Sequence, residues 1–179
     1  MKHPLEAIPH GKRLVVFLAL LAVFLVITIG FRFIGPAEPS IVDFELAGTT
    51  DRAAEIINAW DMQDRIRAGF NLGLDYLYMP VYSTLIALVC VWGAGVVASR
   101  QWRATGLLLG WGLWIAALFD AVENAMLAVV LFDTVAAPYP QVAQVCAIFK
   151  FGLIVLGLVF AAVAAVVYLV RRLKSKTKS

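Results

Sequence analysis

Four long apolar runs limit what this chain can fold into more than any other feature. They extend over residues 14–31, 72–98, 106–132 and 142–170. A helix needs about 20 apolar residues to cross the roughly 30 Å hydrocarbon core of a membrane. Membrane β-strands are only about 10 residues long and alternate in polarity, so continuous runs of this length exclude a barrel. We therefore expect an all-α, polytopic membrane protein, a four-transmembrane-helix bundle forming one domain over residues 1–179.

The composition agrees with this class, because 62% of the 179 residues are hydrophobic and only 15% are charged. A soluble domain is nearer half apolar and a quarter charged. Cys90 and Cys146 are expected at different depths in their helices, too far apart for a disulfide. His3 and His10 both precede the first span. We therefore expect no metal site, no cofactor and no nucleic-acid partner.

The basic residues predict which way the chain is oriented. Of the 15 Lys and Arg residues, four fall in the two loops that share one side of the membrane, Arg32, Arg52, Arg65 and Arg67. Ten fall on the side of the termini: Lys2, Lys12, Arg13, Arg100, Arg103, Arg171, Arg172, Lys174, Lys176 and Lys178. Because cytoplasmic segments carry the excess of Lys and Arg, both termini are predicted to be cytoplasmic. We expect a multi-pass protein of a bacterial inner or plasma membrane.

The segment 35–71 between the first two spans is too long for a simple link. Alternation in VDFELAG, residues 42–48, predicts a short extended piece. Helical spacing of Ala53, Ile56, Ile57 and Trp60 then predicts an amphipathic, extracytoplasmic surface helix, with Thr50 or Asp51 as N-cap and Gly69 as its stop. Such a helix is expected to lie at the interface or across the mouth of the bundle.

Polar residues within the third span, in the motif FDAVENAM, raise the question of function. Counting 1.5 Å per residue from the outer ends of their spans, Glu123 and Lys150 both lie about 13 Å deep on adjacent antiparallel helices. Asp120 lies one turn deeper, and Tyr82 reaches about the level of the pair. We therefore predict a polar site in the outer half of the bundle, formed by Asp75, Tyr82, Asp120, Glu123, Asn124 and Lys150.

Two interpretations of this site stay open. Glu123 and Lys150 could be a structural ion pair that fixes the register of two helices. One lysine cannot balance Asp75, Asp120 and Glu123 together, and we expect Arg32 to be too shallow to reach Asp120. The surplus of carboxylates favours a polar pocket that receives a ligand's positive or hydrogen-bonding group. The GLLLG spacing of Gly106–Gly110 is interpreted as helix packing rather than as a dimer motif.

The topology and the segment LDYLYMPVY, with an acid before a proline in the second span, resemble EXPERA-domain proteins, the family of the sigma-2 receptor and emopamil-binding protein. The resemblance implies that Asp75 and its neighbours hold an amine or hydroxyl of a sterol or cationic amphiphile. The strongest acidic motif here is in the third span instead of the second. The His and Glu set of the sterol isomerases is absent. The chain is equally similar to bacterial four-helix membrane proteins in general.

We predict an integral membrane protein that binds a lipid or amphipathic small molecule. In this interpretation Asp120 and Glu123 hold polar or cationic groups, Lys150 orients a carboxylate, and Tyr82 and Asn124 supply hydrogen bonds. An enzyme that transfers protons on a lipid would use the same residues. The alternatives are a proton- or cation-translocating protein, and a structural or accessory subunit whose acids pair with a membrane-protein partner or with another copy of the chain.

Overall fold

The computed structural model describes residues 2–36 and 38–176, and within these ranges every regular element is helical. The elements are η1 (Pro4–Ala7), α1 (His10–Ile34), α2 (Ile41–Glu45), α3 (Thr50–Ala59), α4 (Met62–Gly93), α5 (Arg100–Phe132) and α6 (Tyr139–Lys176). Among the described residues, α1, α4, α5 and α6 are long and apolar enough to cross a membrane. The all-α fold is confirmed, and the four apolar helices indicate a multi-pass membrane protein. Residues 177–179, which include Lys178 from the basic residues counted on the side of the termini, lie outside the described ranges.

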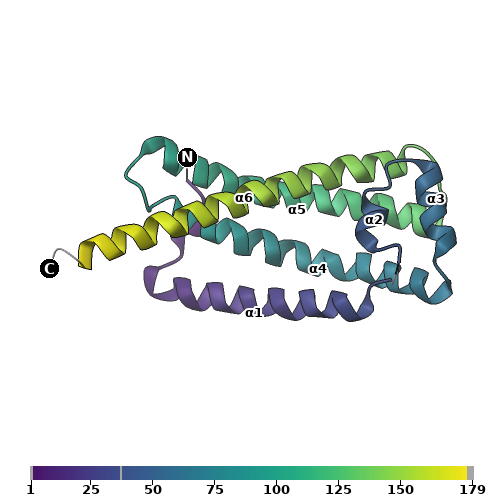
Figure 1. Cartoon of the computed structure of the whole chain (residues 1–179), viewed down its shortest axis with the longest axis horizontal. Helices are drawn as coiled ribbons and strands as arrows, with labels where there is room; N and C mark the ends of the chain where they lie inside the picture. Colours follow the sequence, from purple (N-terminus) through teal and green to yellow (C-terminus); the bar gives the residue numbers. More distant parts are fainter. Residues whose placement is uncertain (1, 37, 177–179) are drawn as a thin grey trace.

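The bundle consists of a closely packed group of three helices with a fourth beside it. Helices α4, α5 and α6 pack against one another along their length, whereas α1 lies mainly along α4 and buries none of its residues (Figure 1). Helices α2 and α3 cross one end of the bundle, and η1 lies at the other end (Figure 1). We refer to these as the α2–α3 end and the terminal end. At the terminal end, α6 projects beyond the other helices.

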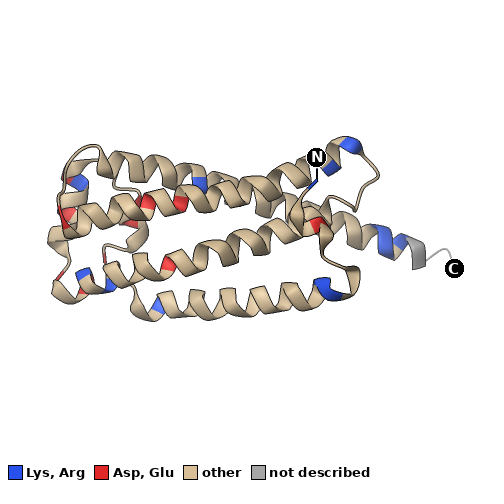
Figure 2. Cartoon of the chain, turned by 180° about the vertical axis from the view of Figure 1, so that it is seen from behind, with Lys and Arg blue, Asp and Glu red and all other residues tan. Residues whose placement is uncertain are grey.

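Two apolar cores lie at different heights in the bundle. The core near the terminal end includes Leu88, Leu113 and Phe160, from α4, α5 and α6. The core near the α2–α3 end is built around Phe44 and Trp60. Figure 2 shows most charged residues at the two ends of the molecule. A few lie in the interior, in the half nearer α2 and α3.

The expected extended piece at residues 42–48 is wrong, because residues 42–45 belong to helix α2. Ser40 caps the helix: its side chain accepts from the Asp43 amide, and the Asp43 carboxylate accepts from the Ser40 amide. This reciprocal cap satisfies amides at the start of the helix and outweighs the weak alternation of the sequence. Phe44 is consequently turned into the core and is 1% exposed.

Within the segment predicted to form an amphipathic surface helix, the structure has helix α3, with limits that differ from the prediction. It begins after the N-cap Thr49, ends at Ala59, and buries Ala53, Ile56 and Ile57. Asp61 then caps α4 by accepting from the Asp64 amide, and α4 continues through Gly69 into the second span. Gly69 is therefore not a stop. It lies against the Phe132 ring, where a side chain would collide.

Candidate functional site

A buried cation lies at the centre of the bundle among three carboxylates. The Lys150 ammonium on α6 donates to Glu123 Oε1 at 2.9 Å and to Asp120 Oδ1 at 3.0 Å, both on α5. It also lies 3.4 Å from Glu45 Oε2 on α2. The predicted pairing of Glu123 with Lys150 is confirmed. Because an ammonium has three donors, these three contacts use its full donor capacity.

Helix α4 completes the polar cluster from the other side. The Tyr82 hydroxyl donates to Asp120 Oδ2 at 2.8 Å, so Asp120 is held by both Tyr82 and Lys150. The Asn124 amide donates to Asp75 Oδ2 at 2.8 Å and to the Leu72 carbonyl at 3.4 Å. Each of these bonds joins two different spanning helices, and the cluster therefore links α4, α5 and α6 to one another.

Helical periodicity explains why these side chains meet. Asp120, Glu123, Asn124 and Leu127 recur at intervals of three and four residues, which places them on one face of α5. All four are buried. On α6, Ala147 and Ala143 are fully buried, one and two turns respectively before Lys150. Such small residues allow close helix approach, so the lysine reaches its partners across the interface.

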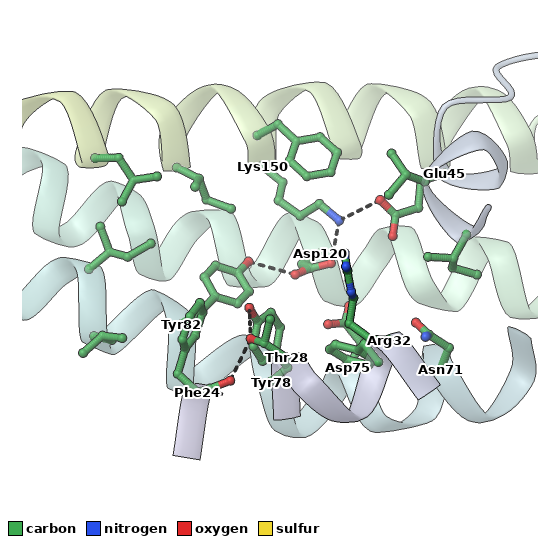
Figure 3. A pocket seen from close by; sticks show the side chains of 18 of the residues that line it. Phe24, Thr28, Arg32, Glu45, Asn71, Asp75, Tyr78, Tyr82, Asp120 and Lys150 are labelled. Carbon is green, nitrogen blue, oxygen red and sulfur yellow. Dashed lines mark hydrogen bonds and ion pairs between the residues drawn. The ribbon is translucent and has the colours of Figure 1, made fainter. Parts of the chain in front are cut away.

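A groove of about 1130 Å³ opens beside this cluster, between α1, α4 and α6. Its polar end, nearer α2, is lined by Arg32, Glu45, Asp75, Tyr82, Asp120 and Lys150 (Figure 3). Its apolar end, toward the terminal end of the bundle, is lined by Phe17, Leu85, Val89, Ile154, Leu158 and Ala162. Along α1 the lining reaches from Phe17 to Arg32, a helical rise of about 22 Å.

The six residues predicted for the site divide into two groups. Asp75, Tyr82, Asp120 and Lys150 line the groove. Glu123 and Asn124 do not line it and lie behind it, where they hold Lys150 and Asp75 in position. Lys150 is surrounded by carboxylates, so the expected role of orienting a ligand carboxylate does not fit the geometry.

Two groove residues were not among the predicted site residues. Arg32, which we expected to be too shallow to reach Asp120, lines the polar end of the groove and points into it from α1 (Figure 3). Glu45 was assigned to a surface segment. The Ser40-x-x-Asp43 capping pattern could have predicted α2, but the sequence carries no signal that Glu45 turns inward.

The cluster carries more negative than positive groups. Lys150 faces Glu45, Asp120 and Glu123 within one buried site, and Asp75 lines the same groove. Burial raises the pKa of the Glu45 carboxyl above its ordinary value, and the neighbouring Lys150 only partly opposes this shift. Glu123 Oε2 is buried without a hydrogen-bond partner among the described residues. This arrangement can bind protons or groups that donate hydrogen bonds.

No family model, curated protein or solved structure matches this chain in the comparisons that we made. The interpretation of the site therefore depends on its geometry and chemistry.

Proposed function

We propose that this protein binds a lipid or amphipathic small molecule in the groove between α1, α4 and α6. The observation that carries the proposal is the division of one cavity into a charged end and a long apolar end. A lipid has the same division between its head and its chains. The cavity of about 1130 Å³ slightly exceeds the usual range of about 300–1,000 Å³ for small-molecule sites, which suits a lipid-sized ligand.

The charges at the polar end favour a head that donates hydrogen bonds or carries a positive charge. Lys150 already donates to its carboxylate neighbours. Asp75 Oδ2 accepts from Asn124, which leaves the acceptor capacity of the other oxygen available to a ligand. A negatively charged ligand head would add to the existing surplus of carboxylates at this end of the groove, where Arg32 would be its counterion. Hydroxyl and amine heads therefore fit better than phosphate or carboxylate heads.

The resemblance to EXPERA-domain proteins points in the same direction and is itself part of the proposal. Asp75 would be the residue that holds the head, and the chain's own geometry adds Asp120 and Tyr82 at the same end of the groove. A purely structural ion cluster, or an accessory subunit, explains the burial of Lys150 but leaves a groove of this size without a role. A proton- or cation-translocating protein remains the alternative that uses the same acids.

Mass spectrometry of small molecules that co-purify with the protein in mild detergent tests the proposal. Ala162→Trp would fill the apolar end of the groove, because Ala162 lines it. The adjacent Val163 is exposed and does not line the groove, so Val163→Trp is the matched control. We expect wild type and V163W to retain a defined amphiphile that A162W loses.

A third variant tests the polar end. Asp75→Asn removes a negative charge and keeps the size of the side chain. If the ligand head is a donor, D75N loses most of the retained ligand while still folding, as judged by its elution profile. The same background of membrane lipids in all four proteins would contradict the proposal and leave the structural or accessory role.

A further inference from the structure

Glu45 and Glu123 meet inside the cluster although they come from different kinds of element. Glu45 ends the short helix α2, and Glu123 lies in the middle of the long helix α5. The two carboxyl groups lie within hydrogen-bonding reach of each other, and both approach the Lys150 ammonium. Glu123 is 0% exposed, and its Oε2 atom has no partner within the described part of the chain.

One added proton would allow the Glu45 and Glu123 carboxyl groups to form a hydrogen bond with each other. Two carboxylates have only acceptor atoms, so in their ionised forms they cannot bond each other. A protonated carboxyl group gains one O–H donor, and its neighbour's free oxygen can accept it. Because adjacent like charges disfavour each other, a close carboxyl pair characteristically holds one proton between its two groups. The orphaned Glu123 oxygen is the acceptor that such a proton requires.

We propose that Glu45 and Glu123 share one proton, and that this proton-binding site holds α2 against the bundle. Charged groups face the pair from every neighbouring spanning helix. They are Arg32 on α1, Asp75 on α4, Asp120 on α5 and Lys150 on α6. Lys150 is in direct contact with both carboxyl groups. Its single positive charge cannot neutralise the pair together with Asp120.

The proton is linked to the position of α2 because Glu45 is the member of the pair that can leave. Glu123 is fixed in a spanning helix, whereas α2 is five residues long and is followed by Gly48, whose φ of 68° is readily adopted by glycine. The Gln144 side chain also holds this segment, by donating to the Leu46 carbonyl at 2.9 Å. When α2 is undocked, Glu45 is an ordinary solvated glutamate.

The sign of the pH dependence follows from the raised pKa of the docked Glu45 carboxyl. The docked state holds the proton more tightly than the undocked state. Docking is therefore most stable below the pH at which a free glutamate ionises, and it weakens as pH rises through the pKa of the docked group. Each unit of pKa difference changes the docking equilibrium by up to about tenfold.

Hydrogen–deuterium exchange of residues 41–47 tests the proposal in detergent-solubilised protein stripped of bound lipid. After correction for intrinsic exchange, wild-type protection should fall by about tenfold or more between about pH 5 and about pH 9. Glu45→Gln should abolish this dependence, because its amide donates to Glu123 at every pH. Glu55→Gln is the matched control, since Glu55 is on the exposed face of α3, and it should behave like wild type.

Infrared spectroscopy of the wild type gives a second, direct readout. A protonated carboxyl band should persist near pH 7 in wild type and in E55Q, and it should be lost in E45Q. A wild type without this band, or with protection that is independent of pH, overturns the proposal even if E45Q does not fold. Neither measurement needs a ligand, so a failure of the proposed lipid binding would leave this result intact.

One consequence rests on the proposed function. Because Ser40, Ile41 and Val42 line the polar end of the groove, undocking of α2 would open that end. The bound amphiphile should then be released faster at about pH 9 than at about pH 5 from wild type, with equal rates from E45Q. If the wild type released the amphiphile at the same rate at both pH values, this consequence would be contradicted. The shared proton itself would still be tested by the exchange and infrared measurements.

Discussion

Lys150 Nζ lies 2.9 Å from Glu123 Oε1, across the interface of α5 and α6. Both side chains are buried, with exposed fractions of 5% and 0%. Burying two charges in a membrane protein is costly unless each finds its partner. This contact therefore makes one alignment of the two helices much more favourable than a shift by a turn.

Removing the cation should damage the fold more than removing any surface charge. Lys150→Met removes the ammonium that contacts all three of Glu45, Asp120 and Glu123. We expect a loss of about 3–5 kcal/mol in the free energy of unfolding, because breaking a buried pair leaves an uncompensated charge. Thermal or denaturant unfolding in detergent measures this free energy. Lys12→Met, at an exposed lysine of α1, is the control and should change the free energy of unfolding little.

A double substitution separates lost electrostatics from lost packing. Glu123→Gln removes one of the stranded charges, so the variant with both changes should lose less stability than the sum of the two single losses. Residues in direct contact typically give coupling of about 0.5–3 kcal/mol. Strict additivity would mean that the contact between Lys150 and Glu123 does not itself stabilise the protein.

Tyr82→Phe tests the hydrogen bond that ties α4 to the cluster. Tyr82 is 4% exposed, and its hydroxyl donates to Asp120 Oδ2. Loss of a donor to a buried carboxylate should cost about 1–3 kcal/mol of unfolding free energy. Tyr168→Phe, at an exposed tyrosine of α6, is the control. An equal effect of the two changes would show that the Tyr82 bond does not stabilise the fold.

The parts of the fold governed by period and length could be predicted from the sequence. Counting residues from the ends of two apolar runs was enough to bring Glu123 and Lys150 to the same depth, because a helix rises by a fixed amount per residue. The end of the second span was less certain. It was expected at residue 98, but α4 ends at Gly93. The apolar run continues through Val96 and Ala98 although the helix does not, so hydropathy alone could not locate the end of α4.

The parts that depend on contacts between distant segments could not be predicted. Glu45 lies 105 residues from Lys150 in the chain, and its neighbours in sequence do not indicate that it faces inward. Trp60 ends α3 instead of continuing it, and its indole donates to the Pro39 carbonyl at 2.7 Å. His3 was placed in an N-terminal tail, but its ring is buried between Trp111 and Trp114.

His3 should make docking of the N-terminal segment depend on pH. Burial lowers the pKa of His3 below its ordinary value. A lowered pKa in the docked state means that docking is complete above the pKa of free histidine, about 6.5, and weakens as pH falls through it. Hydrogen exchange of residues 3–8 should therefore accelerate as pH falls from about 7 to about 5, after correction for intrinsic rates.

Two substitutions test whether His3 causes the pH dependence of hydrogen exchange in residues 3–8. His3→Phe keeps an aromatic ring against Trp111 and Trp114 but cannot titrate, so exchange should lose its pH dependence. His10 is exposed at the start of α1, and His10→Phe should leave the dependence unchanged. If H3F retains the wild-type response, the response arises elsewhere, and the Glu6–Arg103 ion pair at the same segment becomes the next group to test.

The contact at Gly106, on α5, should tolerate no added methyl group. A Cβ atom on Gly106 would lie 2.7 Å from Ala94 Cβ and 2.9 Å from the Cys90 carbonyl oxygen. These contacts within one chain agree with the interpretation of the GLLLG spacing as packing. Since backbone cannot move aside cheaply, Gly106→Ala should destabilise the protein by about 1–3 kcal/mol.

Gly152→Ala is the matched control for this substitution, because a Cβ atom there would meet nothing within 4 Å. Alanine favours a helix over glycine by up to about 1 kcal/mol, so G152A should be neutral or slightly stabilising. Unfolding of both variants in the same detergent gives the comparison. If G106A matched or exceeded the wild type in stability, α4 and α5 would have to separate without cost. The steric account of this contact would then fail.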